Sequence, residues 1–386
     1  MRLYRTIFIA LQILSLGVIL IWYHNDSMRN LFRQDERTLA SRNEQRWMKL
    51  KEKYQLLVNL SLWKGDSSTN RRMIYSCQSF CGGWGDRLRG ILSVYVLALL
   101  TNRQFLIDMN YPCAISKVIE PNFVNWTFTR PPSPNNRTRL SINTMRSWQK
   151  AYREEIANTI KSKDLMNIWS SYDDIYISTN SDYMLLAFQN GYLRNETRRL
   201  LGRIPVGQAT MHNLFAFLYE LLFKPSLAVR ERVDRILSAS YNHHLICFHV
   251  RVGKNPTNPF DHAFTARVNM TQSMLKFTDR YMLNRSSSFV FITSDSGQSV
   301  SEVLQHYPQS SMTIVGPILH IDRFDRRART ICDGYVKVLA DFYMLGECQT
   351  SLLTRSGFSY WANKRRKNEY DNFYTYNENT RQMHKN

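Results

Sequence analysis

Apolar runs of strand length alternate with segments of helical length in two parts of the chain. In the first part, residues 73–76 predict a strand, residues 88–100 are nearly all apolar at helical length, and residues 104–108 predict a second strand. This order forms a βαβ unit. Residues 131–139 are expected to form a loop, and residues 145–227 to be mainly helical.

The second part begins near Tyr241 and repeats the alternation more regularly. Such a pattern is typical of a parallel sheet with helices on both faces. Strands are predicted at residues 245–250, 289–293, 312–315 and 351–354, and helices near 268–281, 299–307 and 330–345.

The first 23 residues differ from the rest of the chain. Residues 7–23 are apolar apart from Gln12 and Ser15, and Arg2 and Arg5 precede them. The run is just long enough to span a bilayer, and the basic residues place the short tail, residues 1–6, in the cytosol. A cleaved signal peptide is the alternative, but no small-residue cleavage site follows the run. We therefore expect a retained signal anchor, with the remainder of the chain lumenal.

Residues 24–71 are polar, and we predict that they form a stem between the signal anchor and the globular part. Within them Trp47, Leu50, Tyr54 and Leu57 form a short stripe at helical spacing. Two interpretations stay open: a stalk that pairs with a second copy as a homodimer, or a single helix that packs back onto the globular part. The globular part is expected to divide into residues 72–240 and 241–363, followed by a polar, loosely ordered tail, 364–386.

Two further features are consistent with a lumenal chain. The six cysteines are an even number, as expected for disulfides in an oxidising compartment. Cys247 lies inside a predicted strand and is expected to be a free thiol in the core. Cys77 and Cys81 lack a second ligand pair, so a zinc site is not expected. Apart from Asn25, which is too near the membrane, the candidate N-glycosylation sites are Asn59, Asn125, Asn136, Asn195, Asn269 and Asn284.

The formal net charge of +20 fits an anionic substrate or an anionic membrane. A nucleic-acid partner is not expected, because no nucleic-acid motif occurs and a lumenal chain does not meet nucleic acid. The basic run at residues 364–367 is interpreted as a solvated helix end.

Polar groups follow three predicted strands of the second part. His249, Arg251 and Lys254 follow the first strand, Asp295 the second, and Ser356 the third. The carboxyl ends of parallel strands share one edge of a sheet, where a nucleotide binds. Arg251 offers a planar fork of donors to a diphosphate, Ser356 and the next glycine offer hydroxyl and N–H groups at a helix N-terminus, and Asp295 can accept from a base or a ribose.

A glycine-rich turn, residues 79–86 with the sequence S-F-C-G-G-W-G-D, joins the first strand to the first helix. It matches neither the dinucleotide fingerprint nor the Walker loop. The glycines can serve the approach of a phosphate or the close packing of strand and helix, and the sequence leaves both open.

In their order, these motifs resemble those of the α1,2-, α1,6- and protein O-fucosyltransferase superfamily. The resemblance rests on the turn C-G-G-W-G-D-R-L-R-G, on H-V-R at residues 249–251, on F-I-T-S-D at 291–295 and on S-G-F-S-Y-W at 356–361. It covers residues 72–364 and is patchy between residues 112 and 242. It implies an α/β, GT-B-like fold of two Rossmann-like halves, with GDP-fucose held by the second half and inversion at the fucose anomeric carbon.

The resemblance also implies roles for single residues. Arg251 would bind the β-phosphate, His249 and Asp295 would face the guanine nucleoside, and Trp84 and Ser356 would line the donor pocket. No Asp-x-Asp motif occurs, so a metal-bridged donor is not expected, and no cofactor is implied. The full set expected at the donor is Gly83, Trp84, Gly85, Arg87, His249, Arg251, Asp295, Ser296, Ser356, Gly357 and Phe358.

The chain departs from the family pattern at the position of the catalytic base. Lys254 is close to the Lys of the α1,6 branch, but Pro259 stands near the position of its Glu. Asp261, followed by His262, is the nearest carboxylate and the candidate base; a loose transition state that needs little base assistance is the other option. The expected catalytic residues are therefore Arg251, Lys254 and Asp261.

These features predict a type II Golgi membrane fucosyltransferase that uses GDP-fucose and a glycan or glycoprotein acceptor. The alternative is a non-catalytic lumenal protein of the same fold that binds a nucleotide sugar or a glycan.

Overall fold

The computed structural model describes residues 38–65, 69–129, 138–145, 150–253, 264–267, 269–281, 287–324, 329–366 and 371–386. The expected signal anchor, Lys254 and Asp261 lie outside these ranges. Among the helices within them, none combines the length and the apolar character that a membrane span requires.

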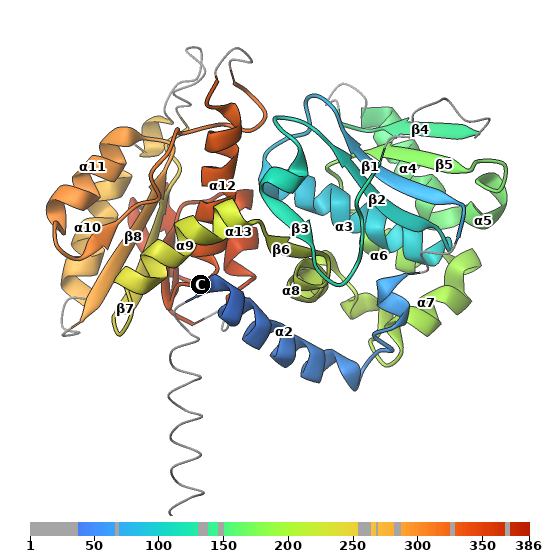
Figure 1. The fold of residues 1–386 in the computed structure, drawn as a ribbon, viewed down its shortest axis with the longest axis horizontal. Helices are drawn as coiled ribbons and strands as arrows, with labels where there is room; N and C mark the ends of the chain where they lie inside the picture. The colour runs from blue at the N-terminus through green and yellow to red at the C-terminus, as the bar shows by residue number, and fades with distance from the viewer. Residues whose placement is uncertain are drawn as a thin grey trace, which may run out of the picture.

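The N-terminal half is built on a four-stranded parallel sheet in the order β2-β1-β5-β4 (Figure 1). Its strands are β1 (Arg72–Cys77), β2 (Gln104–Met109), β4 (Arg139–Asn143) and β5 (Asp174–Ser178). The predicted βαβ unit is confirmed, with α3 (Trp84–Leu100) as the connecting helix. Nearly every side chain of α3 is buried, which explains why its sequence is apolar all round.

The remaining elements of this half lie around the sheet. The expectation that residues 145–227 are mainly helical misses two short strands, β5 and the three-residue β6 (Phe223–Pro225). The sheet buries β5, and local sequence does not separate such a short apolar strand from a helical segment. The helices are α4 (Lys150–Ser162), α5 (Leu165–Ile168), α6 (Met184–Phe188), α7 (Arg194–Leu201) and α8 (Met211–Leu222), and β3 (Ile119–Pro121) pairs antiparallel with β6 (Phe223–Pro225).

The C-terminal half contains a six-stranded sheet in the order β12-β11-β10-β7-β8-β9. All neighbouring strands are parallel except β11 and β12. The predicted strands and helices of this half are confirmed, although the strand expected at 312–315 is shorter. The elements are β7 (His244–Val250), α10 (Met270–Tyr281), β8 (Ser288–Ser294), α11 (Gly297–His306), β9 (Ser311–Met312), α12 (Ile331–Leu345), β10 (Thr350–Leu353) and α13 (Gly357–Asn363). Helix α9 (Leu227–Ala239), which the expected boundary at residue 240 assigned to the first half, packs against α12 of this half.

The expectation of a loosely ordered tail is wrong. Residues 373–377 and 382–385 form a hairpin, β11 (Phe373–Asn377) and β12 (Gln382–Lys385), in which β11 adds to the edge of the sheet beside β10. Tyr376 is buried against the second hydrophobic core. The polar composition of the tail reflects one solvated face of an edge hairpin rather than disorder.

The basic run that precedes the hairpin is not a solvated helix end. Arg365 is fully buried, and its Nη2 lies 3.0 Å from Glu220 Oε1 of α8. The guanidinium also lies 4.3 Å from the ring centroid of Tyr343. The sequence could not show this, because the partners of Arg365 come from distant parts of the chain and only folding brings them together.

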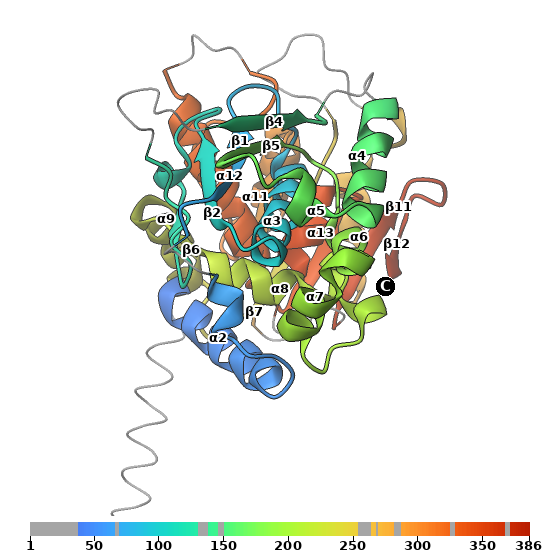
Figure 2. The ribbon, with the colours of Figure 1, turned by 90° about the vertical axis from the view of Figure 1, so that its right-hand side faces the viewer.

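The helix expected in the stem is α2 (Leu39–Gln55), and it packs against the globular part of its own chain. In both views it runs along one side of the molecule, next to α8 (Figures 1 and 2). Trp47 stacks on Phe123 with ring centroids 4.4 Å apart, and Tyr54 stacks on Phe217 at 4.5 Å. Of the two interpretations, the structure shows the packed-back helix, and its apolar stripe is used within the chain.

One arginine of α2 contacts both halves. Arg46 Nη2 lies 2.5 Å from Glu347 Oε1, just after α12, and its Nη1 lies 3.4 Å from Glu220 Oε1 of α8. Burial opposes the ionisation of Glu347, but Arg46 and Arg42 outweigh it and hold the pKa of Glu347 below its usual value. Helix α2 therefore braces the two halves.

All six cysteines form disulfides: Cys77–Cys81, Cys113–Cys332 and Cys247–Cys348. The prediction of a free Cys247 is wrong, because β7 places it beside the segment that carries Cys348 between α12 and β10. Cys113–Cys332 joins the N-terminal half covalently to the start of α12. Of the candidate glycan acceptors, Asn59, Asn125, Asn195 and Asn269 are exposed, and Asn136 and Asn284 lie outside the described residues.

Candidate functional site

A cavity of about 650 Å³ lies between the two halves. Its C-terminal wall includes residues at the carboxyl ends of β7, β8 and β10. Its N-terminal wall includes the glycine turn after β1, Met145 after β4, Arg153 of α4 and Asn180 after β5. Both parallel sheets therefore present their carboxyl edges to one cleft, which is where ligands bind in open α/β sheets.

All residues expected at the donor line this cavity except Arg87 and Ser296. Ser296 instead caps α11, where its side chain accepts from the N–H of Ser299. Lys254 and Asp261 lie outside the described residues. The expected donor residues that line the cavity are Gly83, Trp84, Gly85, His249, Arg251, Asp295, Ser356, Gly357 and Phe358.

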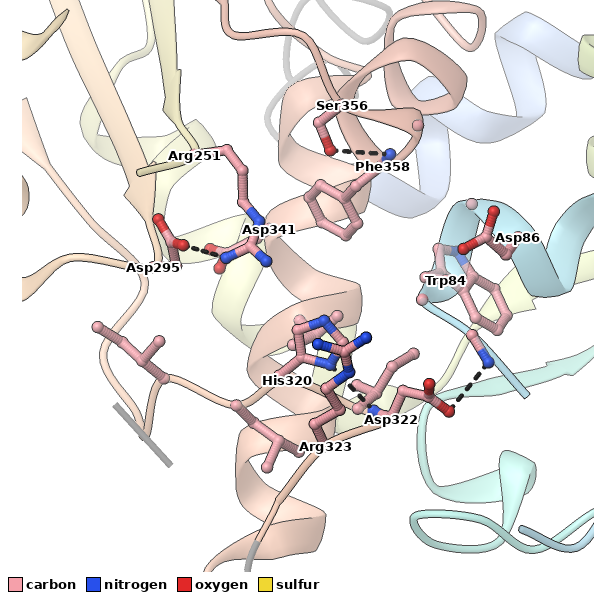
Figure 3. A pocket seen from close by; sticks show the side chains of 18 of the residues that line it. Trp84, Asp86, Arg251, Asp295, His320, Asp322, Arg323, Asp341, Ser356 and Phe358 are labelled. Carbon is pink, nitrogen blue, oxygen red and sulfur yellow. Dashed lines mark hydrogen bonds and ion pairs between the residues drawn. The ribbon is translucent and has the colours of Figure 1, made fainter. Parts of the chain in front are cut away.

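Arg251 and Asp295 form an ion pair on the C-terminal wall (Figure 3). Asp295 Oδ1 also accepts from the Val252 N–H at 2.7 Å, and Oδ2 accepts from the Gly253 N–H at 2.8 Å. These contacts of Asp295 fix the backbone just after β7 and the direction of the Arg251 guanidinium. A hydrogen bond from a base or ribose to Asp295, as expected from the sequence, would compete with these bonds.

His249 is buried beside Arg251. Its ring lies 5.6 Å from the ring of Phe358, and its Nδ1 is 3.4 Å from Thr354 Oγ1. Burial, with the positive charges of Arg251 and Arg267, lowers the pKa of His249 to about 3. The imidazole is therefore neutral at neutral pH and adds no charge to the cavity.

The sequence left open whether the glycines of the turn serve the approach of a phosphate or close packing. The structure shows the reason for glycine at Gly82 and Gly85. A Cβ atom on Gly85 would lie 2.7 Å from the backbone of Gly357, so glycine here lets α3 approach α13 across the cleft. Gly82 has a φ of +82°, in the left-handed region that favours glycine. Close packing and turn geometry account for these two glycines.

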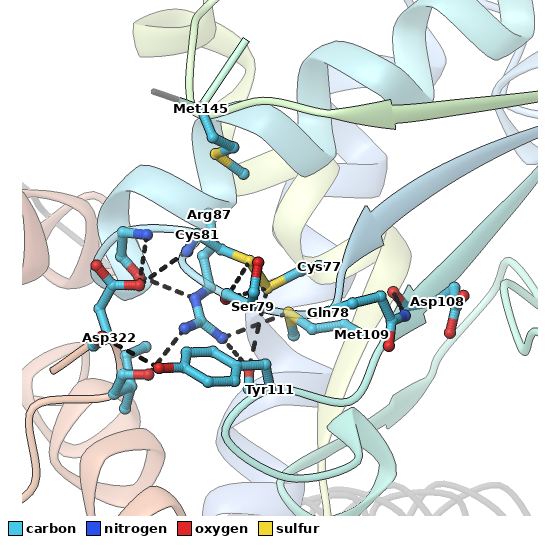
Figure 4. Close-up of a disulfide and its surroundings, with 12 residues drawn as sticks. Cys77, Gln78, Ser79, Cys81, Arg87, Asp108, Met109, Tyr111, Met145 and Asp322 are labelled. Carbon is cyan, nitrogen blue, oxygen red and sulfur yellow. Dashed lines mark hydrogen bonds between the residues drawn. A yellow bond between two sulfur atoms is a disulfide. The ribbon is translucent and has the colours of Figure 1, made fainter. Parts of the chain in front are cut away.

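An acidic residue of the C-terminal half holds this turn in place. Asp322 Oδ1 accepts from the backbone N–H groups of Cys81 at 2.8 Å and Gly82 at 2.9 Å (Figure 4). Arg87, which is fully buried, donates to Gly82 O at 2.9 Å and to Ile321 O at 3.0 Å. Arg87 therefore ties the turn to the opposite half instead of facing the cavity. Asp322 was missed because it lies in a loop whose partners are adjacent only in space.

Lys337 and Asp341 of α12 also line the cavity, and they too were missed in the sequence. Lys337 Nζ lies 2.6 Å from Asp341 Oδ2, and both side chains are buried. Burial raises the pKa of Asp341, and Lys337 opposes that rise. Two opposite charges four residues apart in an otherwise apolar helix were the signal that could have revealed them.

Comparison with solved structures places this cleft in a known fold. The chain is similar to a mutant of Arabidopsis thaliana FUT1 in complex with GDP, with a TM-score of 0.54, 14% identity, and coverage of 88% of this chain and 78% of that one. The chain therefore shares the fold of this GDP-bound structure.

Two further similar structures are NodZ and POFUT1. The NodZ α1,6-fucosyltransferase, co-crystallised with GDP, matches at a TM-score of 0.49 with 16% identity, covering 82% of this chain and 99% of that one. The apo form of POFUT1 matches at 0.45 with 11% identity, covering 81% and 99%. No protein-family model and no curated protein sequence matches the chain.

Proposed function

We propose that the chain transfers fucose from GDP-fucose to a hydroxyl of a glycan or glycoprotein, with inversion and without a metal ion. The observation that carries this proposal is the placement of Arg251, held by Asp295, at the carboxyl edge of the C-terminal sheet. The fold is shared with FUT1, whose structure contains GDP.

Arg251 is suited to the diphosphate. As the bond between fucose and GDP breaks, negative charge develops on the β-phosphate oxygens. A guanidinium whose direction is already set by Asp295 stabilises that charge without reorganising. Arg251 thus takes the role that a metal ion has in other nucleotide-sugar enzymes.

The Lys337–Asp341 pair is suited to guanine. Guanine presents an acceptor, O6, beside two adjacent donors, N1–H and N2–H₂, so an ammonium group beside a carboxylate complements this edge. Adenine and uracil each offer a carboxylate only one donor group on the corresponding edge. Both oxygens of Asp295 already accept hydrogen bonds, whereas Asp341 contacts Lys337 through Oδ2, so we assign guanine recognition to the Lys337–Asp341 pair, with Phe358 beside His249 as an apolar wall.

The compartment is part of the same proposal. A signal anchor at residues 7–23 would place the catalytic region in the Golgi lumen. The three disulfides and the four exposed acceptor asparagines support this topology. Protease protection of the chain in sealed microsomes, with glycosidase-sensitive mobility, is the expected result; a digestible globular part would contradict it.

The activity is tested with the full chain purified in detergent. It is incubated with labelled GDP-fucose, GDP-mannose or UDP-galactose on a mixed glycan and glycoprotein array, with and without EDTA. We expect label transfer from GDP-fucose alone, unchanged by EDTA. Transfer from another donor, or GDP binding without turnover, would contradict the proposal, and the second outcome identifies a binding protein.

A further inference from the structure

Fucosyl transfer releases the proton of the acceptor hydroxyl, and the residues assigned to the donor do not accept it. In the proposed reaction, on which this inference rests, the acceptor oxygen forms a bond to fucose C1, and the bond from C1 to the β-phosphate oxygen breaks. Its electron pair leaves with GDP. In general base catalysis, the hydroxyl proton passes to a group within hydrogen-bonding reach of the acceptor oxygen.

Two groups on the C-terminal wall are unsuited to take this proton. His249 is buried and, because its neutral form is strongly favoured there, it is a weak base. Asp295 accepts from Arg251 and from two backbone N–H groups, so both of its oxygens are already bonded. A base must have an accessible lone pair directed at the substrate, and neither residue has one.

The loop and the helix beside them offer no better group. Asp322 is buried and accepts the two N–H groups of the glycine turn. His320 Nδ1 accepts from the Asp322 N–H at 3.3 Å, so the neutral ring carries its proton on Nε2 and acts there as a donor. Asp341 is buried against Lys337.

Asp86 differs from all of these carboxylates. It lies in the first turn of α3, lines the cavity, and has a side chain that is 43% exposed. Its Oδ1 lies 2.5 Å from Arg89 Nη2, which orients the carboxylate. No residue in the described part of the chain donates a hydrogen bond to Oδ2. Asp86 thus lines the cavity with a partly exposed carboxylate, whose Oδ2 lies beside the glycine turn at Gly82 and Gly83.

The position of Asp86 also fits the stereochemistry. Inversion requires the acceptor oxygen and the departing phosphate to lie on opposite sides of C1. Arg251 lies on the C-terminal wall, and Asp86 lies on the facing N-terminal wall (Figure 3). An acceptor hydroxyl that enters along the N-terminal wall therefore meets Asp86 while GDP departs toward Arg251.

We propose that Asp86 is the general base that removes the acceptor proton. In the transition state Oδ2 accepts the hydroxyl proton, and the neutral acid then releases it to solvent after GDP leaves. Asp261, nominated from the sequence, is the competing residue.

The test compares Asp86→Asn with Asp261→Asn in the full chain. We expect Asp86→Asn to lower kcat for transfer about 10²- to 10³-fold, with the Kd for GDP-fucose unchanged. The wild-type rate should fall at acidic pH as the base protonates, and this limb of the pH profile should be absent in the variant. Asp86→Glu should retain part of the activity, and formate should restore part of the activity of Asp86→Ala.

Asp333→Asn is the matched control. Asp333 also lies in the first turn of a helix and also pairs with an arginine, Arg232, but it does not line the cavity. We expect this variant to transfer at the wild-type rate. A near-wild-type kcat for Asp86→Asn, or a large loss confined to Asp261→Asn, would overturn the assignment. Absence of transfer by the wild-type chain would instead contradict the proposed function itself.

Discussion

The two walls of the cleft differ in how far their functional side chains are exposed. On the C-terminal wall Arg251 pairs with Asp295 and Lys337 pairs with Asp341, and none of these four side chains is more than 26% exposed. On the N-terminal wall Asp86 pairs with Arg89 but is 43% exposed, and Phe80 is 53% exposed. One wall is already organised, whereas the other remains open to solvent.

This difference matches two tasks. Charges held in place by partners can stabilise a leaving diphosphate without a cost of reorganisation, so the organised wall suits a donor of constant structure. Exposed aromatic and carboxylate groups at the ends of loops suit an acceptor, because loops on a rigid scaffold carry specificity. Substitutions at three residues of the C-terminal wall, in addition to the Asp86 series, test this contrast.

The largest effect is expected from Arg251→Ala. Removal of the guanidinium leaves the departing phosphate without its cation, and we expect kcat to fall about 10³-fold. Arg251→Lys keeps the charge but loses the planar fork, so its kcat should lie between the two. Melting temperatures should stay close to wild type, since the side chain borders the cavity. Normal turnover by Arg251→Ala would show that the donor binds elsewhere.

A smaller loss is expected from Asp295→Asn, because it acts through Arg251. The amide keeps the shape of the carboxylate but loses the ion pair, so Arg251 is no longer directed at the diphosphate. We expect kcat to fall about 10- to 100-fold, and the effect should largely vanish in an Arg251→Ala background, since the two residues act as a unit. Additive effects in this double-mutant cycle would mean that Asp295 contacts the substrate independently.

The smallest effect concerns stability and pH. The unfolded chain protonates His249 below its ordinary pKa of about 6.5, whereas the folded protein does so only near a pKa of about 3. The unfolded state therefore binds the extra proton, and the free energy of unfolding falls as pH drops from 6.5 toward 3. Between pH 6 and 5 this amounts to about 1 kcal/mol for one proton.

His249→Gln removes that proton-binding site from the unfolded chain. Denaturant titrations at pH 7, 6 and 5 should therefore give a smaller loss of unfolding free energy for the variant than for the wild type. Equal slopes in the two proteins would show that His249 is not held neutral by the fold.

The elements of the C-terminal half could be predicted because each is specified locally. The run at 245–250 is apolar and β-branched or aromatic in part, its length suits a strand, and helical segments flank it. Parallel strands place their carboxyl ends at one edge of a sheet, and this rule alone was enough to group Arg251, Asp295 and Ser356. The cavity lining confirms this grouping.

The sequence was sufficient to predict the alternation of strands and helices and the polar groups at strand ends, because both depend on neighbours within a few residues. Tertiary structure decided which charges are buried, which cysteines pair, and that α2 braces both halves. Arg365 meets Glu220, and Asp322 meets the glycine turn, across long stretches of chain. Such contacts are stabilised only when the whole fold removes both partners from water, so no local pattern records them.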